Sequence, residues 1–328
     1  MKNVPLVRAI AGVAAVAATI AGMAPAGAQT YPDRPIRLVV PFPPGGGSDI
    51  TARTIAQKLS EVLGQQVVAD NRGGAGGNIG TDIVAKSQPD GYTLVMALSG
   101  PFTINGSLMG KLPFDPLKDF ALITLAGATP NLLVTHPSLA ANSVKELIAL
   151  AKASPGKINF ASSGLGTPAQ LSGDLFNAMA GVRLVHVPYK GAAPALTDLL
   201  AGQVQLMFST MPPALPQVKA GKLRALAVTS AKRSLTLPEL PTIAEAALPG
   251  FEATTWYGMA APAGTPKPIV AKLNADVLKV LHMADVRERL LAQGTEPAGT
   301  TPEQFADYIR SETTKWAKVI KASGAKVD

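Results

Sequence analysis

The sequence predicts an α/β protein of two domains, each a mixed β-sheet flanked by helices, with a hinge between them. Two glycine-rich segments, at residues 41–49 and 70–80, each follow an apolar strand pattern and precede a helical one. From Lys157 to Thr229 strand and helix patterns alternate, which is typical of βαβ units and a mostly parallel sheet. With 328 residues, the chain is long enough for two domains behind a leader.

The first 28 residues are predicted to be a secretory signal peptide. Lys2 and Arg8 provide the positive start, residues 9–23 the apolar stretch, and Ala26-Gly27-Ala28 the small-residue cleavage site. The apolar stretch is shorter than the roughly 20 residues of a membrane span. We therefore expect cleavage after Ala28, a periplasmic location and the following organisation: signal peptide 1–28, first part of domain 1 29–127, domain 2 128–231, and the rest of domain 1 232–328.

Composition excludes several classes of protein. The chain has no cysteine, which rules out disulfides, thiolate metal sites and a lipoprotein anchor. Its net charge of +8 falls to +6 without Lys2 and Arg8, because 28 basic and 22 acidic residues remain. A mildly basic protein can concentrate anionic ligands. Scattered Lys and Arg residues with 5% aromatic content do not predict nucleic-acid binding.

The first glycine turn is the most informative stretch. Ile36 to Val40 reads as a strand buried on both faces, and the prolines that follow end it. Gly45 to Gly47 then lead into a helix for which Ser48 or Asp49 is a suitable N-cap. Because free N–H groups at the start of a helix attract negative charge, this turn is suited to hold an anion.

A second turn has the same organisation. Val67 and Val68 lead into the segment Asp70 to Gly80, and a helical pattern follows through Ala85. Ligands of open α/β sheets bind at the carboxyl ends of the strands, so both turns should face one crevice. The two turns together predict a site for a small ligand.

Further elements follow from local patterns. We expect a strand at 92–98, two strands at 120–125 and 132–134, and a turn at 127–131 that makes the first crossing between domains. Ser143 and Glu146 form a capping box for a helix that ends near Ala153. The alternating region then provides strands at 158–162, 184–187, 203–208 and 223–229, with helices at 168–179 and 193–201.

The C-terminal part is predicted to return to the first domain. Residues 232–249 are rich in proline and weakly patterned, and 254–261 resembles a returning strand. Helices at 266–281, 284–293 and 301–323 follow, the last opened by a capping box of Thr300 and Glu303. We expect this helical tail to pack on the first domain.

Three stretches carry a resemblance to a known family. Residues 41–49 (PFPPGGGSD), 71–77 (NRGGAGG) and 187–191 (VPYKG) resemble the Bug-type (TctC-like) solute receptors of tripartite tricarboxylate transporters, and the resemblance covers nearly all of the mature chain. It implies a type II-like periplasmic-binding-protein fold whose cleft closes on a small organic acid. It also implies that loop amides and bridging waters hold the carboxylate, and that transporter membrane subunits are partners of a monomeric receptor.

The loop from Ser162 to Thr167 is expected to be the second domain's counterpart of the first glycine turn, although Ser163 or Thr167 could also serve only as an N-cap. Tyr189 and Lys190 follow a strand and could face the crevice, whereas Trp256 and Tyr257 are expected in the core or the crevice floor. The predicted ligand-binding residues are Phe42, Gly46, Gly47, Ser48, Asp49, Gly76, Asn78, Ser99, Ser163, Gly166, Thr167, Tyr189 and Ser209.

Two positions depart from the family pattern. Gln170 stands where many members have histidine, and Ser209 stands where many have aspartate. The second change removes a partner for a ligand ammonium group, so the resemblance favours carboxylates without an amine.

No motif of a catalytic, metal or cofactor site is present. The chain lacks the Rossmann fingerprint, the P-loop and G-x-S-x-G, and its three histidines lie far apart. We therefore predict a binding protein without enzymatic activity, metal or cofactor. The alternatives are a ligand-sensing periplasmic subunit for a signalling partner and a hydrolase that uses Ser48 or Ser163.

If backbone amides hold the carboxylate, the affinity for the ligand should change little between pH 6 and pH 8, because amides do not titrate. Gly46→Val should then weaken binding more than Lys190→Ala.

Overall fold

The computed structural model describes residues 31–325, so the predicted signal peptide and its cleavage site lie outside the described residues. Residues from Arg34 onward form one compact unit, which contains all of the elements named below. Within the described part, no helix is both long and apolar enough to cross a bilayer. The unit is α/β, with mixed sheets flanked by helices, as predicted.

The strands are β1 (Ile36–Val40), β2 (Val67–Asn71), β3 (Thr93–Leu98), β4 (Phe120–Thr135), β5 (Asn159–Ser162), β6 (Val185–Pro188), β7 (Leu206–Thr210), β8 (Arg224–Val228), β9 (Thr254–Pro262) and β10 (Glu296–Pro297). The helices are α2 (Gly47–Leu63), α3 (Asn78–Ala85), α4 (Asn105–Leu108), α5 (Val144–Ala153), α6 (Pro168–Ala180), α7 (Ala192–Leu200), α8 (Met211–Lys219), α9 (Ile243–Ala246), α10 (Lys267–His282), α11 (Ala284–Ala292) and α12 (Pro302–Ser323). A 3₁₀ turn η1 (Ala75–Gly77) precedes α3, and a π-helical turn η2 (Gly100–Ile104) precedes α4.

The first sheet has the strand order β2-β1-β3-β9-β4. β1 runs parallel to β2 and β3, and β9 runs antiparallel to β3 and β4. Ile36 and Leu38 of β1 are completely buried, as expected for a strand covered on both faces. The strand, glycine turn and helix predicted at the start of the chain are confirmed.

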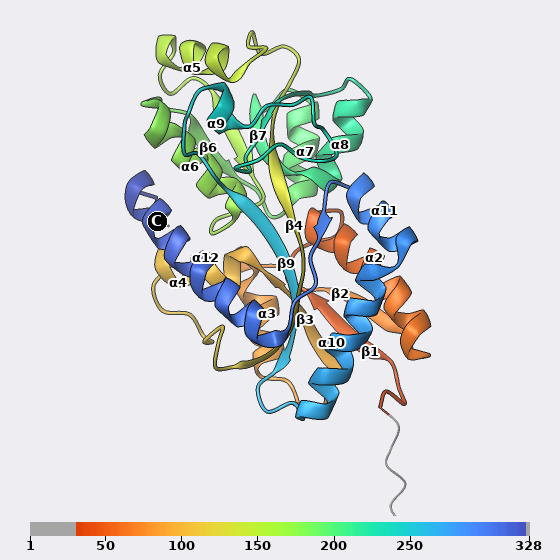
Figure 1. Cartoon of the computed structure of the whole chain (residues 1–328). Helices are drawn as coiled ribbons and strands as arrows, with labels where there is room; N and C mark the ends of the chain where they lie inside the picture. Colours follow the sequence, from red (N-terminus) through yellow and green to blue (C-terminus); the bar gives the residue numbers. More distant parts are fainter. Residues whose placement is uncertain (1–30, 326–328) are drawn as a thin grey trace, which may run out of the picture. The chain divides into compact units, whose positions relative to one another are not determined.

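β4 corrects the prediction of two strands separated by a turn at 127–131. It is one strand of 16 residues, whose first part pairs with β9 and whose last five residues pair with β7 and β8 of the second sheet. A Cβ atom at Gly127 would lie 2.7 Å from the Glu296 carbonyl oxygen, so this glycine permits a close backbone approach rather than a turn. Figure 1 shows β4 and β9 side by side, and β4 continuing into the second sheet.

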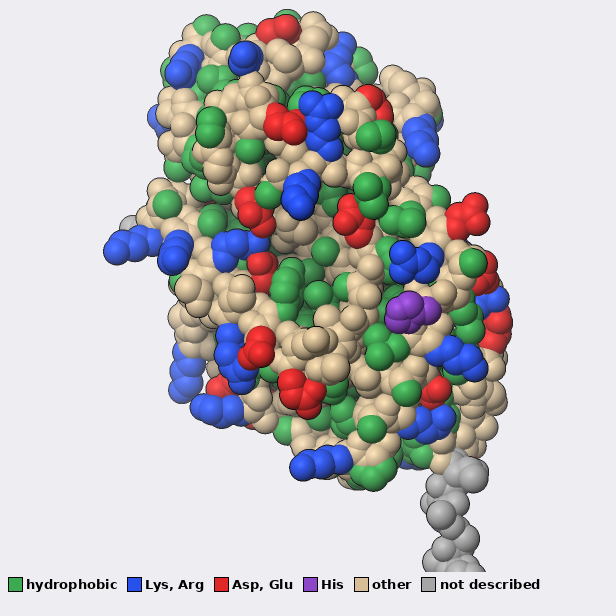
Figure 2. Space-filling model, viewed as in Figure 1, with side chains coloured by type: hydrophobic (Ala, Val, Ile, Leu, Met, Phe, Trp, Pro, Cys, Tyr) green, Lys and Arg blue, Asp and Glu red, His purple; other side chains and the backbone are tan. Residues whose placement is uncertain are grey.

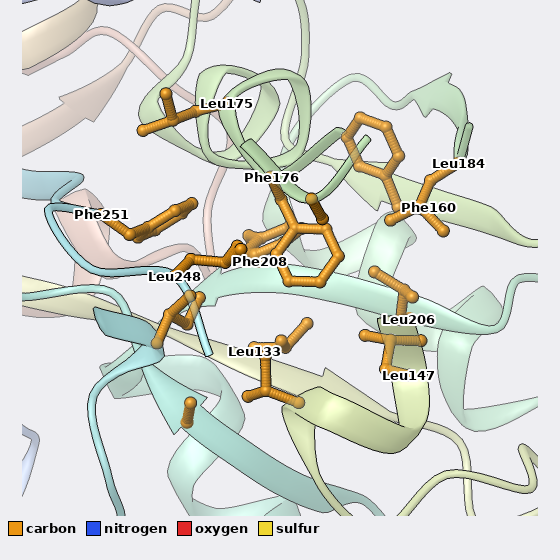
Figure 3. Packing of buried hydrophobic residues seen from close by; sticks show 14 of the residues in the cluster. Leu133, Leu147, Phe160, Leu175, Phe176, Leu184, Leu206, Phe208, Leu248 and Phe251 are labelled. Carbon is orange, nitrogen blue, oxygen red and sulfur yellow. The ribbon is translucent and has the colours of Figure 1, made fainter. Parts of the chain in front are cut away.

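The second sheet contains β8, β4, β7, β5 and β6, and β5 is parallel to both of its neighbours. Its core on one face holds Phe160, Phe176 and Phe208, whose rings pack edge-on or tilted at centroid distances near 6 Å (Figure 3). Leu132 and Leu133 of β4 lie in cores on opposite faces, as expected for alternating residues of a strand.

The segment after β8 stays with the second sheet. Leu248 and Phe251 belong to the core around Phe208, and Figure 3 shows them beside it. The chain returns along β9, which begins at Thr254. This packing favours a return at Thr254 rather than at Lys232.

Helix α12 spans both sheets, which corrects the expectation that the tail packs on the first domain. Phe305 and Ile309 lie in the core of the first sheet, whereas Trp316 lies in the core of the second. The helix also starts one residue later than predicted: the capping box is formed by Thr301 and Gln304, not by Thr300 and Glu303. Pro302 at the first helical position is consistent with this register.

Candidate functional site

A cavity lies beside the glycine turn that precedes α2. Its volume is about 60 Å³, and a water molecule needs roughly 10–15 Å³ on the same measure, so the cavity suits a small ligand. Residues from strands, loops and helix starts of both sheets line it: Phe42, Pro43, Gly46, Gly47, Ser48, Leu98, Ser99, Gly100, Ser163, Thr167, Pro168, Ala169, Ala192, Met207, Phe208, Thr210, Thr255 and Tyr257.

The start of α2 forms one wall of this cavity. Gly46 is the N-cap and no side chain caps the helix, so the prediction that Ser48 or Asp49 does so is wrong. Gly47 and Ser48 belong to the first turn, where N–H groups have no carbonyl partner within the helix. Both residues line the cavity. The 17-residue helix therefore presents donor groups and its positive end there.

Asp49 does not line the cavity; its side chain stabilises the glycine turn. It is 5% exposed, and its carboxylate accepts hydrogen bonds from the Gly45 amide at 3.0 Å and from Asn71 Nδ2 at 3.0 Å. Arg53 Nε donates to the same carboxylate at 2.9 Å. These contacts hold the glycine turn in place and compensate the buried charge.

The loop before α6 forms the opposite wall. Thr167 caps α6 by accepting from the Gln170 amide, and the Gln170 side-chain oxygen accepts from the Gly166 amide at 2.8 Å. Ser162 is completely buried and hydrogen-bonds Gly164 and His186. Gln170 thus holds this loop with an amide that does not titrate.

Loops of the two sheets touch across the cleft. A Cβ atom at Gly100 would lie 2.8 Å from the Gly166 carbonyl oxygen, and one at Gly76 would lie 2.5 Å from the Leu165 carbonyl oxygen. The first residue of each pair belongs to the first sheet's loops, and the second belongs to the loop before α6. Such close approaches leave no room for a side chain, so these loops are in direct contact across the cleft.

The structure distributes the thirteen predicted residues over three places. Seven line the cavity: Phe42, Gly46, Gly47, Ser48, Ser99, Ser163 and Thr167. Asp49, Asn78 and Ser209 are buried, and their side chains bond within the protein. Gly76 and Tyr189 line a second, outer cavity, whereas Gly166 is buried in the loop before α6. A role in ligand binding stays a prediction for all of them.

An outer cavity of about 600 Å³ adjoins the inner one and shares Phe42, Pro43 and Ser163 with it. Gly76, Tyr189 and the exposed Lys190 line it. The Tyr189 hydroxyl donates to Asp198 at 2.6 Å, and burial together with this carboxylate raises the pKa of Tyr189 to about 12. The phenol is therefore engaged on α7.

Sequence reasoning missed several lining residues, of which Thr210 and Thr255 carry hydroxyl groups. Thr210 was missed because the strand predicted to end at Phe208 continues to Thr210. Thr255 Oγ1 donates to Asn131 Oδ1 at 3.1 Å, a residue of β4 distant in the sequence. The only local signal for Thr210 was that a hydroxyl residue follows shortly after the end of a predicted strand.

The lining residues of the inner cavity include no Lys, Arg, His, Asp or Glu. Among residues 31–325 no group of three or more His, Asp or Glu side chains gathers as a metal site would.

His186 stacks on Phe160 at a centroid distance of 4.8 Å, and burial lowers its pKa to about 4, so it is neutral near pH 7. Its serine partner is the buried Ser162, and neither Ser48 nor Ser163 has a histidine partner in the described structure. This geometry does not support the hydrolase alternative.

Asp174 of α6 makes stability depend on pH. Burial raises its pKa from 3.8 to about 6, against a smaller opposing effect of the Gln170 amide. Between these two pKa values the folded state retains a proton that the unfolded chain has lost. The free energy of unfolding is therefore highest, as far as this group is concerned, below about pH 4, and it declines as the pH rises to about 6. We expect Asp174→Asn to melt above the wild type at pH 7 and close to it at pH 4, measured by thermal denaturation. The exposed Asp307→Asn serves as the control, and a difference that is the same at both pH values would contradict this assignment.

Comparison with known proteins gives the family. The family described as "Tripartite tricarboxylate transporter family receptor" matches residues 51–325. Protein BugT of Bordetella pertussis is 43% identical over 326 residues, which cover 99% of each chain. The chain therefore belongs to the tripartite tricarboxylate transporter receptor family, as the resemblance indicated.

Two solved structures have the same fold. Rpa4515 of R. palustris, solved with adipate, is 41% identical with a TM-score of 0.88, covering 90% of this chain and all of that one. MatC (Rpa3494) from Rhodopseudomonas palustris, solved with bound malate, is 35% identical with a TM-score of 0.84, covering 88% of this chain and all of that one. The predicted fold class is thereby confirmed.

Proposed function

We propose that this chain is a periplasmic solute-binding receptor that captures a small dicarboxylate in the cleft between its two sheets. The observation that carries the proposal is the inner cavity, which offers amide and hydroxyl donors but no charged side chain. Helix N-termini attract anions, and buried donors lose free energy unless an acceptor meets them. A carboxylate supplies such acceptors.

The two walls differ in a way that favours two carboxylates joined by an apolar chain. Donors lie at the start of α2 and at the loop before α6, and the apolar side chains of Leu98, Met207 and Phe208 also line the cavity. The relatives solved with adipate and with malate support a dicarboxylate. An amino-acid ligand is disfavoured because an ammonium group would need an acidic acceptor, and the lining includes no Asp or Glu.

Export, partners and assembly belong to the same proposal. The signal peptide would be cleaved after Ala28, and the mature monomer would deliver its ligand to the membrane subunits of a tripartite tricarboxylate transporter. Domain 1 would comprise residues up to about 130 and from 254 onward, with domain 2 between them. Lys and Arg side chains are interspersed with Asp and Glu on the face shown in Figure 2, which supports a small ligand rather than nucleic acid.

No residue is assigned a catalytic role, since the receptor releases its ligand unchanged. A sensor subunit of the same fold is the second candidate. Genes for the large and small membrane subunits beside this gene would support transport, and a gene for a membrane kinase in their place would support sensing.

Calorimetric titration tests the ligand class. We expect adipate, succinate or malate to bind more tightly than butyrate and aspartate, and the affinity to change less than threefold between pH 6 and pH 8 because amides do not titrate. The Asp174→Asn variant, titrated in parallel, separates the ionisation of that residue from binding. Tighter binding of aspartate, or no binding of any dicarboxylate, would overturn the proposal.

A further inference from the structure

The hydroxyl group of Tyr257 is buried without a partner. Tyr257 lies on β9, is 1% exposed and lines the inner cavity. Its oxygen has no hydrogen-bond partner in the part of the chain that the structure describes. Buried tyrosine hydroxyls usually find a partner, because an unmet donor loses the hydrogen bond that it made to water. An unmet hydroxyl at a cavity therefore points to a group that is absent from the unliganded protein.

This hydroxyl lies at the start of α2. A Cβ atom at Gly47 would be 2.5 Å from Tyr257 Oη and 2.6 Å from Thr210 Oγ1, so both oxygens lie close to the first helical residue. The Thr210 hydroxyl is a near neighbour of the phenol, but the two do not meet the geometry of a hydrogen bond. Both hydroxyl groups therefore lie beside the first turn of α2, whose N–H groups have no carbonyl partner within the helix.

The phenol can act there only as a neutral hydroxyl. Complete burial raises the pKa of Tyr257 well above its ordinary value of 10. The group is thus protonated near pH 7 and has a proton to donate. Its position beside the first turn of α2 favours an anionic oxygen, because the start of a helix carries partial positive charge.

We propose that Tyr257 is a ligand-binding residue whose hydroxyl donates a hydrogen bond to a carboxylate oxygen held at the start of α2. This inference rests on the proposed function, because it identifies a side-chain donor that binds one carboxylate of the proposed ligand. In the unliganded protein the same hydroxyl is a source of instability. Removing this oxygen should therefore weaken ligand binding without lowering the stability of the unliganded protein.

The variant Tyr257→Phe removes this oxygen and keeps the ring. Adipate is titrated calorimetrically into the full mature chain of the wild type and the variant, and thermal melting is recorded without ligand. We expect the affinity to fall about 10- to 100-fold and the unliganded variant to melt at or above the wild-type temperature. Tyr308→Phe, on α12 against Trp256 at 5.9 Å, is the matched control and should bind adipate as the wild type does.

The outcomes separate this inference from the proposed function. If the wild type binds adipate and Tyr257→Phe binds it equally well, the role of Tyr257 is overturned and the receptor function stands. If the wild type binds neither adipate nor succinate nor malate, the receptor proposal and the carboxylate role of Tyr257 both fall. If the unliganded variant melts several degrees lower, the hydroxyl has a partner in the free protein and the inference is overturned.

Discussion

Replacing Gly47 by alanine is expected to reduce dicarboxylate affinity at least 100-fold, about 3 kcal/mol, while the protein stays folded. The new methyl group would lie 2.5 Å from Tyr257 Oη and 2.6 Å from Thr210 Oγ1, closer than side-chain atoms pack. It would crowd both hydroxyl groups beside the first turn of α2 and displace them. Gly47 has helical rather than left-handed backbone angles, so alanine adds no backbone strain. Calorimetric titration with adipate measures the loss.

Gly46→Ala is the matched control for this prediction. A Cβ atom at Gly46 would lie 3.6 Å from Ala192 Cβ, an ordinary contact, and the backbone there is extended with φ −86°. We expect less than a fivefold change in affinity. The sequence-based expectation for Gly46→Val assumed crowding or a special backbone conformation, and the structure assigns the crowding to Gly47 instead. Equal losses for the two alanine variants would refute the role of the first turn of α2.

Replacing Gly100 by alanine is expected to prevent full closure of the cleft and to weaken binding at least tenfold. Its Cβ atom would lie 2.8 Å from the Gly166 carbonyl oxygen and 3.3 Å from the Gly76 carbonyl oxygen. The first of these atoms belongs to the opposite side of the cleft, so the clash exists only when the cleft is closed. A ligand that binds both walls needs the closed state, and its apparent affinity falls with the population of that state.

Small-angle X-ray scattering with and without saturating adipate tests this expectation. The wild type should become more compact with ligand, and the Gly100→Ala protein should change less. Gly106→Ala in the neighbouring helix α4 is the control, because its Cβ atom would meet nothing closer than 3.9 Å. Closure and affinity equal to wild type in the Gly100→Ala protein would show that the contact does not limit the closed state.

Local patterns predicted the elements whose signals lie within a few residues. The strand at 36–40, the glycine turn and the helix after it agree with the structure because a buried strand, glycines and an apolar helix face occur in sequence there. The capping box at Thr300 was misplaced by one residue since Thr301 and Gln304 satisfy the same spacing. Pro302 at the first helical position was a usable signal for the correct register.

Features that depend on distant parts of the chain were harder to predict. Gly127 and Pro130 read as a turn, yet a glycine within a strand also allows another backbone to approach, and only the position of β10 decides between the two. The apolar face of α12 is periodic throughout, and the sequence does not say that Phe305 and Trp316 belong to different cores.

The candidate site divides in the same way. Glycine-rich turns at helix starts are local, and the sequence located Gly47 and Ser48 beside the cavity. The hydroxyl groups of Thr210 and Tyr257 reach the same point because β7 and β9 belong to different sheets that meet there. No spacing within one element encodes that meeting, so the sequence placed Tyr257 only in the core or the crevice floor and did not place Thr210 at the site.

A crystal structure of the mature protein with bound adipate would show directly which groups hold the carboxylate. We expect its oxygens at hydrogen-bonding distance, roughly 2.7–3.2 Å, from the Gly47 or Ser48 amide and from Tyr257 Oη, with no Lys or Arg side chain in contact with that carboxylate. A ligand held in the outer cavity with its carboxylate paired to Lys190 would contradict this expectation.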